Sequence, residues 1–566
     1  MVDKQLDMNI KLRPWQSDAV DKALDWLLIK NKDKRFLINA APGTGKTICA
    51  AVIAKELFER EEINRVIVIA PRKEVVNQWR SEFKAITKRS MLKATGKSED
   101  LGLDICATWN SVHSSLELFN KICKKDKVLV ICDEHHHAAI NAVWGASAEN
   151  AFEQSKFVVV LTGTPIRTDG NKPVWFSYTE RGDRLEHDPS GTYIVDYGQA
   201  VDLKYCRPIF FHRHEGKFSV QLKDDEETIK VSGKNGVKIN SKNRPKKLIS
   251  SLQRSLDFYT LARSPQYKAD GKTPDLNSYQ ASMLEWGVAK LDELKYRLPN
   301  AGGLVIAPNI PVAEHMASIL EMLTKQKPIL VHSKKPNSDD LIEAYRNSKK
   351  DWIVSVAMVS EGVDIKRLRL LIYLPNSQTE LFFRQAMGRV VRSMGDEDDS
   401  RAYVVMPAFK TFENYAKRVE SEMKPVHLKE DLFPKTKKCP SCNKECKIKA
   451  TKCDYCEFDF EKQYKKKIKK CSFCGFENQI NAEKCISCEK SFGIEYTLSL
   501  NEALRMGGIA RQMDISEDEV KDSEKHYETI RKEILESGDA RMIEALGLFP
   551  GESLIKLKKI LNKITD

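Results

Sequence analysis

Residues 41–47 of the chain read APGTGKT. They follow an apolar run at residues 36–40 and precede residues 48–58, which have the composition of a helix. Strand, glycine-rich loop and helix, in this order, form the context that a phosphate-binding loop requires. The glycines let the backbone turn tightly enough for successive N–H groups to point at phosphate oxygens. The stretch therefore predicts an α/β sheet built around a nucleoside-triphosphate site.

Two side chains of this loop have predicted chemical roles. Lys46 would reach the β- and γ-phosphates and Thr47 would bind Mg²⁺, while the helix N-terminus adds a favourable dipole. A chance glycine-rich turn before a helix is a serious alternative for the bare pattern, but the context and the later motifs weigh against it. The residues expected to bind ATP in this loop are Gly43, Thr44, Gly45, Lys46 and Thr47.

Size and charge set the broad class of the protein. The 566 residues are more than one ordinary core accommodates, and the formal net charge of +13 favours an anionic partner. Residues 1–11 are polar, unlike a signal peptide, and no apolar run approaches the roughly 20 residues of a membrane span. We expect a cytoplasmic monomer with no membrane partner, associated with the nucleoid if its source is bacterial.

Strand-like and helical runs alternate after the loop, which favours a parallel sheet covered on both faces. The predicted strands are residues 65–70, 104–109, 128–132 and 157–162. Asp133 and Glu134 directly follow the third of them, at the edge where an open α/β sheet gathers its ligand groups. Asp133 would bind Mg²⁺, and Glu134 would orient or deprotonate the attacking water. An acidic turn at a strand end is the alternative when the pair is taken in isolation.

The alternation restarts at residues 303–308, and further strands are predicted at 328–332, 352–359, 368–374 and 403–406. The sequence SEGVD at 360–364 follows a strand, and QAMGRVVR at 385–392 is placed late in a helix. Arg389 and Arg392 would then share one helix face and neutralise charge on the transferring γ-phosphoryl group. Two arginines on a solvated helix are the default alternative without the other motifs.

The order of the phosphate loop, DEHH at 133–136 and LTGTP at 161–165 resembles that of the superfamily 2 helicases and translocases, over residues of about 12 to 408. The resemblance implies two RecA-like parallel-sheet domains in tandem, with ATP between them and a nucleic acid as partner. The segments 360–364 and 385–392 resemble the fifth and sixth motifs of the family. Gly362 and Asp364 would then help to bind the nucleotide.

The resemblance also implies roles for other residues. Gln16 resembles the glutamine that reads adenine, and residues 70–72 and 107–111 resemble segments that contact nucleic acid. Thr162 and Thr164 would link the ATP state to domain closure. Trp79, by contrast, is expected to pack in the core rather than to stack on a base.

The cysteines near the end of the chain form a repeat. Nine of the 14 cysteines lie between residues 439 and 488. They include two Cys-x2-Cys pairs that both recur 32 residues later. Four thiolates at this spacing predict a closed, structural Zn²⁺ site of ribbon type, present twice. The predicted ligands are Cys439, Cys442, Cys453 and Cys456 in the first ribbon and Cys471, Cys474, Cys485 and Cys488 in the second. Cys446 has Asn478 as its counterpart, so it is interpreted as a spare thiol.

Lysines surround these cysteines, most densely at residues 465–470. They suit contact with a phosphate backbone, although a solvated spacer is the alternative. The sequence thus predicts a first RecA-like domain, an insert or bridge, a second RecA-like domain, a linker, two ribbons and a helical tail. Their predicted bounds are 1–210, 211–300, 301–410, 411–435, 436–495 and 496–566.

The functional prediction is an ATP-dependent DNA helicase or translocase that acts on forked, branched or gapped DNA, with ATP, Mg²⁺ and two structural Zn²⁺. The helicase core with its C-terminal cysteine pairs is similar to bacterial RadD-type proteins, and the core is also similar to phage UvsW and restriction-enzyme motor subunits. An RNA-directed motor is the first alternative. A non-enzymatic zinc scaffold with a degenerate ATPase fold is the second, and the intact Lys46, Asp133, Glu134 and Arg392 weigh against it. No protein partner is predicted.

Overall fold

The computed structural model describes most of the chain. The described residues are 12–71, 73–94, 101–134, 143–163, 175, 178–181, 184–187, 191–221, 228–239, 252–253, 255–356, 365–395, 398–424, 427, 436–439, 441–442, 444–447, 450, 452–458, 468–470, 476–479, 485–487, 495–510, 531–532, 535–536 and 556.

The first sheet is parallel at every described pairing and has the order β3-β4-β2-β5-β6-β1-β9. Its strands are β1 (Arg35–Ala40), β2 (Arg65–Ala70), β3 (Met91–Lys93), β4 (Asp104–Thr108), β5 (Val128–Asp133), β6 (Phe157–Thr162) and β9 (Thr192–Val195). The strands predicted from the sequence are confirmed here, except that Trp109 begins a helix instead of ending β4.

Helices cover both faces of this sheet because its strands are apolar on both sides. In β2, Val66 and Val68 join one core while Ile67 and Ile69 join the other. The first core includes α1 (Pro14–Leu24), α2 (Lys46–Glu59) and α3 (Lys73–Thr87), and the second includes α4 (Trp109–Ser114), α5 (Leu116–Lys125) and α6 (Val143–Phe152). A π-helix, η1 (Asp25–Lys30), extends α1, and α7 (Tyr197–Asp202) follows β9.

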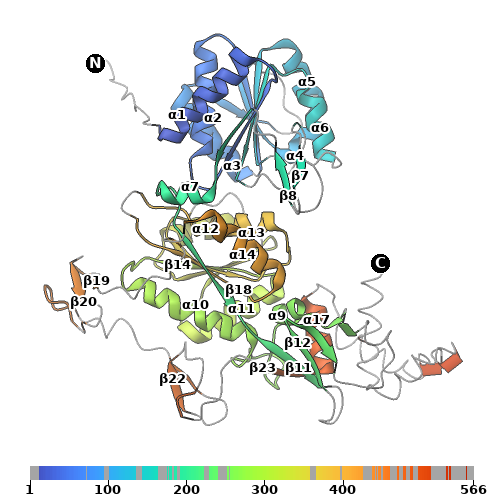
Figure 1. Ribbon diagram of the computed structural model, residues 1–566, viewed down its shortest axis with the longest axis vertical. Helices are drawn as coiled ribbons and strands as arrows, with labels where there is room; N and C mark the ends of the chain where they lie inside the picture. Colours follow the sequence, from blue (N-terminus) through green and yellow to red (C-terminus); the bar gives the residue numbers. More distant parts are fainter. Residues whose placement is uncertain are drawn as a thin grey trace.

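The second sheet is also parallel and has the order β10-β18-β17-β14-β16-β15. Its strands are β10 (Ile209–His214), β14 (Gly302–Ile306), β15 (Ile329–Val331), β16 (Trp352–Ser355), β17 (Leu368–Tyr373) and β18 (Ala402–Pro407). The helices of this half are α9 (Phe258–Arg263), α10 (Tyr279–Lys295), α11 (Ile310–Thr324), α12 (Ser338–Asn347), α13 (Glu380–Met387) and α14 (Lys410–Glu422). Figure 1 shows the two halves one above the other with α7 between them. The prediction of two tandem parallel-sheet domains is confirmed.

The middle segment, predicted as an insert or bridge, is built into the second half. The predicted boundary at residue 210 falls inside β10, which is the edge strand of the second sheet. Helix α10 packs on that sheet closely enough that a Cβ on Gly287 would lie 2.5 Å from Ile372. Past β10, the chain forms the antiparallel strands β11 (Lys217–Gln221), β12 (Thr228–Ser232) and β13 (Gly236–Ile239).

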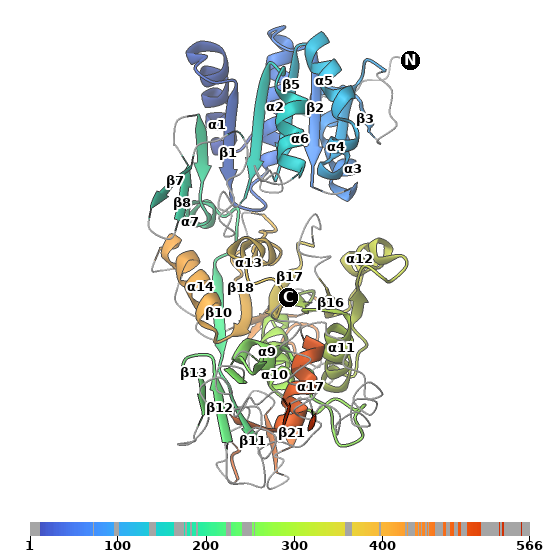
Figure 2. The same cartoon turned by 90° about the vertical axis from the view of Figure 1, so that its right-hand side faces the viewer.

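The tail, predicted to be helical throughout, begins with a strand. This strand, β23 (Glu495–Ser499), pairs in parallel with β11 and completes a four-stranded accessory sheet, β13-β12-β11-β23. Helix α17 (Leu500–Ala510) follows it and lies beside α9 (Figure 2). The hydroxyl of Tyr496 lies 2.8 Å from the Ser282 Oγ, and its ring is 5.5 Å from that of Phe218. The chain thus leaves the second half after α14 and returns to it at β23.

Short hairpins lie outside these sheets. The cysteine region contains β19 (Thr436–Lys438) paired with β20 (Glu445–Lys447), and β21 (Ile468–Lys470) paired with β22 (Glu477–Gln479). A further hairpin joins β7 (Tyr178–Arg181) to β8 (Arg184–His187). Among the described residues, no helix is both long and apolar enough to cross a bilayer.

We expect the returning strand to be needed for the stability of the second half. Tyr496→Ala removes a ring buried against Phe218 and should cost on the order of 3 kcal/mol, as for other buried aromatic side chains. Thr497→Ala is the matched control, because Thr497 is the exposed neighbour on the same strand. Thermal unfolding followed by circular dichroism measures both variants. Equal midpoints for the two variants would contradict the structural role of β23.

Candidate functional site

The phosphate loop lies between β1 and α2 and has the backbone that its glycines permit. Gly43 and Gly45 have φ of 82° and 94°, which glycine adopts without the steric cost borne by other residues. Helix α2 begins at Lys46, whose Nζ donates to the Ala40 carbonyl at 2.8 Å. Thr44 is fully buried, and its hydroxyl donates to the Ala41 carbonyl at 2.7 Å. The lysine is therefore folded against its own loop.

Asp133 and Glu134 stand at the end of β5, at the carboxyl edge of the first sheet where the loop also lies. Glu134 has φ of 51°, an uncommon conformation for a residue other than glycine, and such strain concentrates at functional positions. One of its carboxylate oxygens accepts from the Gly163 amide at 3.4 Å. A Cβ on Gly163 would in turn lie 3.3 Å from Lys46 Nζ, so the loop after β6 touches both groups. Thr162, at the end of β6, is fully buried.

Two tryptophans position Asp133. The indole N–H of Trp79 donates to the Asp133 carboxylate at 2.9 Å, and that of Trp109 donates to its backbone carbonyl at 3.0 Å. Trp79 is fully buried in the core, as expected, but the sequence interpretation missed its link to the site. The sequence offered only a general indication of this bond. A buried indole N–H needs an acceptor, and the carboxylate of Asp133, at the end of β5, is one candidate.

Burial dominates the electrostatics of this edge. It raises the pKa of Asp133 to about 7, with the nearby Glu134 charge acting in the same direction and the Trp79 hydrogen bond opposing it. Burial lowers the pKa of Lys46, while Glu134 and Asp133 oppose that shift. A carboxylate withdrawn from water is a hard oxygen donor of the kind that Mg²⁺ prefers. The residues present therefore fit a magnesium ion carried by a nucleotide.

Gln16 contacts the phosphate loop directly. Its side-chain oxygen accepts from the Arg13 amide at 2.8 Å, and its side-chain nitrogen donates to the Gly45 carbonyl at 2.9 Å. The Arg13 guanidinium donates to the Thr44 carbonyl at 2.9 Å and lies over the ring of Tyr205, 4.3 Å from its centre. The expectation that Gln16 reads adenine stays a prediction. Arg13 and Tyr205 were not predicted from the sequence.

The sixth-motif segment has a different local structure from the one predicted. Helix α13 ends at Met387, so Arg389 and Arg392 do not share a helix face, and that expectation is wrong. The reason is packing: a Cβ on Gly388 would lie 2.9 Å from Pro42 of the phosphate loop, and the chain leaves the helix at this contact. Arg389 is buried, and a Cβ on Gly43 would lie 3.2 Å from Cγ of Arg392. Arg392 therefore touches the nucleotide loop from the second half.

The residues that connect the two halves touch both parts of the site. Cys206 forms an isolated antiparallel bridge with Arg392, and its thiol donates to the Pro42 carbonyl at 3.1 Å. Its neighbour Arg207 is ion-paired with Asp398 at 2.8 Å, and its backbone amide donates to the Val391 carbonyl at 2.6 Å. The sequence carries no motif that singles out this connector. Only the folded chain brings it to the loop.

Some predicted residues lie outside the described part of the chain. They are Arg72, Thr164, Gly362 and Asp364 of the helicase motifs and Cys471, Cys474 and Cys488 of the second ribbon. Cys485 of that ribbon is described and is 1% exposed. The roles assigned to these residues stay predictions.

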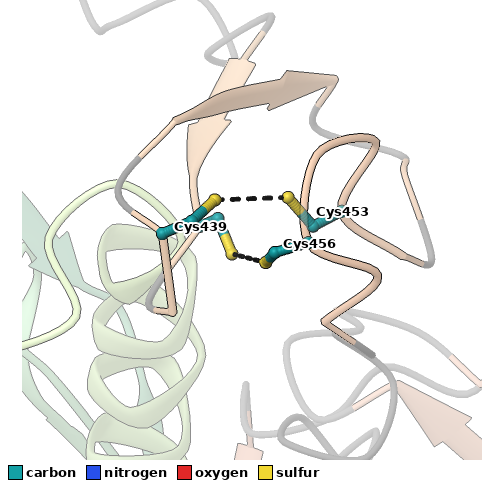
Figure 3. Close-up of side chains that lie close together, drawn as sticks. Cys439, Cys453 and Cys456 are labelled. Carbon is teal, nitrogen blue, oxygen red and sulfur yellow. Dashed lines mark hydrogen bonds between the residues drawn. The ribbon is translucent and has the colours of Figure 1, made fainter.

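The first cysteine set converges as predicted. The four sulfurs of Cys439, Cys442, Cys453 and Cys456 all lie within 4.8 Å of one another. Figure 3 shows Cys439 on one side and Cys453 and Cys456 on the other, with the sulfurs turned inward. Four thiols in a closed cluster of this size are the donor set of a structural zinc ion, so the residues fit that metal.

Comparison with known proteins bears on this geometry. Residues 9–167 match the family model described as "Type III restriction enzyme, res subunit", and residues 289–394 match "Helicase conserved C-terminal domain". An uncharacterized protein of Mycobacterium leprae (strain TN) is 28% identical over 399 residues, which are 69% of this chain and 61% of that protein. The chain thus spans about three fifths of the length of this relative.

Two further similarities are more distant. The DNA 3'-5' translocase XPB2 of Sulfurisphaera tokodaii is 23% identical over 400 residues, which are 69% of this chain and 80% of that protein. Among solved structures, the ATP-dependent Type ISP restriction-modification enzyme LlaBIII bound to DNA aligns with a TM-score of 0.46 and 16% identity. That alignment covers 73% of this chain and 29% of the enzyme.

Two tandem parallel sheets with a phosphate loop at their junction define a RecA-like motor core. The two domain matches support a helicase of superfamily 2. Its first half carries the restriction-enzyme res-subunit domain, and its second half carries the helicase C-terminal domain.

The contact between Gly43 and Arg392 predicts a specific effect on turnover. Gly43→Ala would strain a left-handed backbone and place a methyl group against Arg392, so ATP turnover should fall about tenfold or more. Gly102→Ala is the matched control, because Gly102 has φ of 71° and open space around the added Cβ. Steady-state ATPase assays measure both variants. Equal turnover of the two would show that contact with Arg392 is unimportant.

The raised pKa of Asp133 predicts a dependence of stability on pH. With a folded pKa of about 7, the folded protein retains a proton that the unfolded chain loses near pH 4. The ionised carboxylate therefore costs folding free energy, fully above pH 7 and not at all below about pH 4. Asp133→Asn should stabilise the nucleotide-free, magnesium-free protein above pH 7 by about 2–4 kcal/mol.

The stabilisation by Asp133→Asn should shrink as the pH falls toward 4. Urea unfolding in EDTA at several pH values between 5 and 8 measures it. A gain that does not change with pH would contradict the assignment of a desolvated carboxylate at this position.

Proposed function

We propose that the protein is an ATP-dependent DNA helicase or translocase, which hydrolyses ATP to move on or remodel DNA. One observation carries the proposal: the groups needed for phosphoryl transfer meet at the junction of the two halves. Lys46, Asp133 and Glu134 lie at one edge of the first sheet, and Arg392 reaches the same loop from the second half. The presence of the whole set at one place argues against a degenerate ATPase fold that has lost its activity.

Each group has a role that its position supports. Lys46 would leave the Ala40 carbonyl for the β- and γ-phosphates of ATP. Trp79 holds one oxygen of Asp133, which leaves the other oxygen for the cation. Magnesium, when bound with ATP, neutralises charge on the phosphate oxygens. Glu134, whose carboxylate touches the Gly163 amide, would orient or deprotonate the attacking water.

The arginine makes hydrolysis depend on the position of the second half. Arg392 touches the loop at Gly43 and would stabilise charge on the transferring γ-phosphoryl group. Because Arg392 belongs to the second half, it would act only when the two halves are correctly closed. ATP binding would favour this closed arrangement and product release would relax it, which is a two-state hinge change. Repeated closure is how such a core would step along a strand.

DNA is the favoured partner for three reasons. The chain carries a formal net charge of +13, lysines cluster around its cysteine pairs, and its Sulfurisphaera tokodaii relative is named a DNA translocase. Matched DNA and RNA oligonucleotides, in single-stranded, duplex and forked forms, test the choice through stimulation of ATPase activity. Greater stimulation by RNA than by DNA would establish the RNA-directed motor instead.

The assignment of Glu134 predicts a catalytic defect without loss of fold. Glu134→Gln should hydrolyse ATP at least about 100-fold more slowly and still bind it, since general-base and orienting roles are typically this large. Glu61→Gln is the matched control, because Glu61 is exposed, lies in the same half and has φ of 55°. Single-turnover hydrolysis and nucleotide binding are the two measurements. Substantial turnover by Glu134→Gln would exclude this residue as the base.

The cysteine pairs are proposed to hold two structural Zn²⁺ and to support DNA binding. Metal analysis should therefore return two zinc ions per chain. Because β23 and α17 belong to the second half, the ribbons are best removed by replacing residues 436–494 with a glycine-serine linker. The linker variant should keep basal ATPase and need more DNA for half-maximal stimulation. Unchanged half-saturation and salt dependence would show that the ribbons serve another purpose.

A further inference from the structure

The first cysteine site contains a fifth thiol. Cys446 lies on β20 and is 2% exposed, but it does not belong to the set of four mutually close sulfurs. Its Sγ lies 3.4 Å from that of Cys453. Cys446 is thus a thiol buried against one predicted ligand without belonging to the ligand set, so its function has to be explained separately.

Asn478 occupies the corresponding position of the second repeat, 32 residues later on β22. Its side-chain Nδ2 lies 3.5 Å from the Sγ of Cys485, and Cys485 is the counterpart of Cys453. Cys446 and Asn478 are both buried, at 2% exposure each. The two repeats therefore place a hydrogen-bond donor against the same ligand sulfur.

The remaining contacts of the two residues also correspond. Asn478 Nδ2 donates to the Phe476 carbonyl at 2.8 Å, and Asn478 Oδ1 accepts from the Ile486 amide at 2.8 Å. In the first repeat, the Cys446 thiol faces the Lys444 carbonyl at 3.8 Å, and the Asp454 amide hydrogen-bonds to its sulfur. Lys444 and Asp454 are the counterparts of Phe476 and Ile486. Cys446 and Asn478 thus fill one structural slot.

In each repeat the residue in this slot faces one predicted ligand sulfur, and a donor to a ligand sulfur orients that ligand. The two occupants differ in redox chemistry. A carboxamide is inert to peroxide, whereas a thiol is oxidised and then condenses with a neighbouring thiol. Cys446 is also not occupied as a metal ligand, unlike Cys442, whose Sγ lies 3.6 Å from that of Cys453. It is therefore the sulfur that is free to react while the four-cysteine site is intact.

We propose that Cys446 makes the first cysteine site sensitive to peroxide, by forming a disulfide with Cys453, and that the second site lacks this sensitivity. The proposal rests on the zinc assignment of the cysteine pairs and is independent of ATP hydrolysis. The two sulfurs, 3.4 Å apart, need to approach by about 1.4 Å to reach a bonded distance.

The chemistry balances with peroxide as the oxidant. One sulfur of the pair attacks hydrogen peroxide, which breaks the O–O bond and gives a sulfenic acid. The second sulfur attacks this sulfenic sulfur, forms the S–S bond and expels hydroxide. In sum, one thiolate, one thiol and one peroxide give a disulfide, one water and one hydroxide. Cys453 then offers no thiolate, so the first site keeps three of its four ligands and releases its metal.

The test exchanges the occupants of the slot between the repeats in the full-length chain. Cys446→Asn gives the first repeat the residue of the second, and Asn478→Cys does the reverse. Cys446→Ser keeps a small donor without the redox chemistry and serves if the asparagine variant does not fold. Hydrogen peroxide is added, zinc release is followed with a chromogenic chelator, and disulfides are mapped by peptide mass spectrometry.

We expect the wild-type protein to release one equivalent of zinc about tenfold faster than Cys446→Asn, because the resolving thiol is lost in that variant. Asn478→Cys should release a second equivalent at the fast rate. The wild-type map should contain a Cys446–Cys453 peptide. Equal release rates in wild type and Cys446→Asn, or a map in which Cys446 stays reduced, overturn the proposal.

The zinc assignment and the disulfide are distinguishable in this design. Protein that contains no zinc before oxidation would contradict the assignment made under the proposed function. In that protein, a Cys446–Cys453 disulfide still supports the pairing, and its absence still overturns it.

Discussion

The structure depends on one contact between its two halves, the packing of the segment after α13 on the phosphate loop. Gly43 and Gly388 allow it, because a side chain at either position would meet Arg392 or Pro42 at about the distance of a steric clash. Under the proposed function, Lys46 and the carboxylates would serve the nucleotide from the first half alone. The contact would add the charge of Arg392 from the second half, so that hydrolysis would depend on the relative position of the halves.

The connector between the sheets reinforces this contact. Cys206 binds the loop carbonyl of Pro42 and pairs with Arg392, while Arg207 is fixed by Asp398 and by carbonyls of the same segment. A buried ion pair of this kind costs about 3–5 kcal/mol when one partner is removed, because the other is left desolvated. The connector is thus fixed on the side of the second half and contacts the phosphate loop on the other. A movement of the phosphate loop would therefore reach Arg392 through Cys206, which contacts both.

The second half also organises the rest of the chain. The accessory sheet extends from β10, and β23 returns from the cysteine region to complete it, with Tyr496 packed on Phe218. The segment with the cysteine pairs therefore begins and ends on the second half of the protein. Under the proposed function, this region would move with the second half during closure, as expected of a module that holds nucleic acid beside a motor. In the described residues of the two repeats, Cys446 and Asn478 occupy corresponding positions and differ in their chemistry.

The sequence by itself determined the features that are local in the chain. The phosphate loop, the strands with their apolar runs, the carboxylates after β5 and the cysteine spacing follow from a few consecutive residues each, so they were predictable. Tertiary structure decided what depends on residues far apart: the bond from Trp79 to Asp133, the end of α13 at the contact with Pro42, and the pairing of β23 with β11. A hydrogen bond or a close packing contact needs a partner, and nothing in a local pattern tells which distant residue the fold will supply.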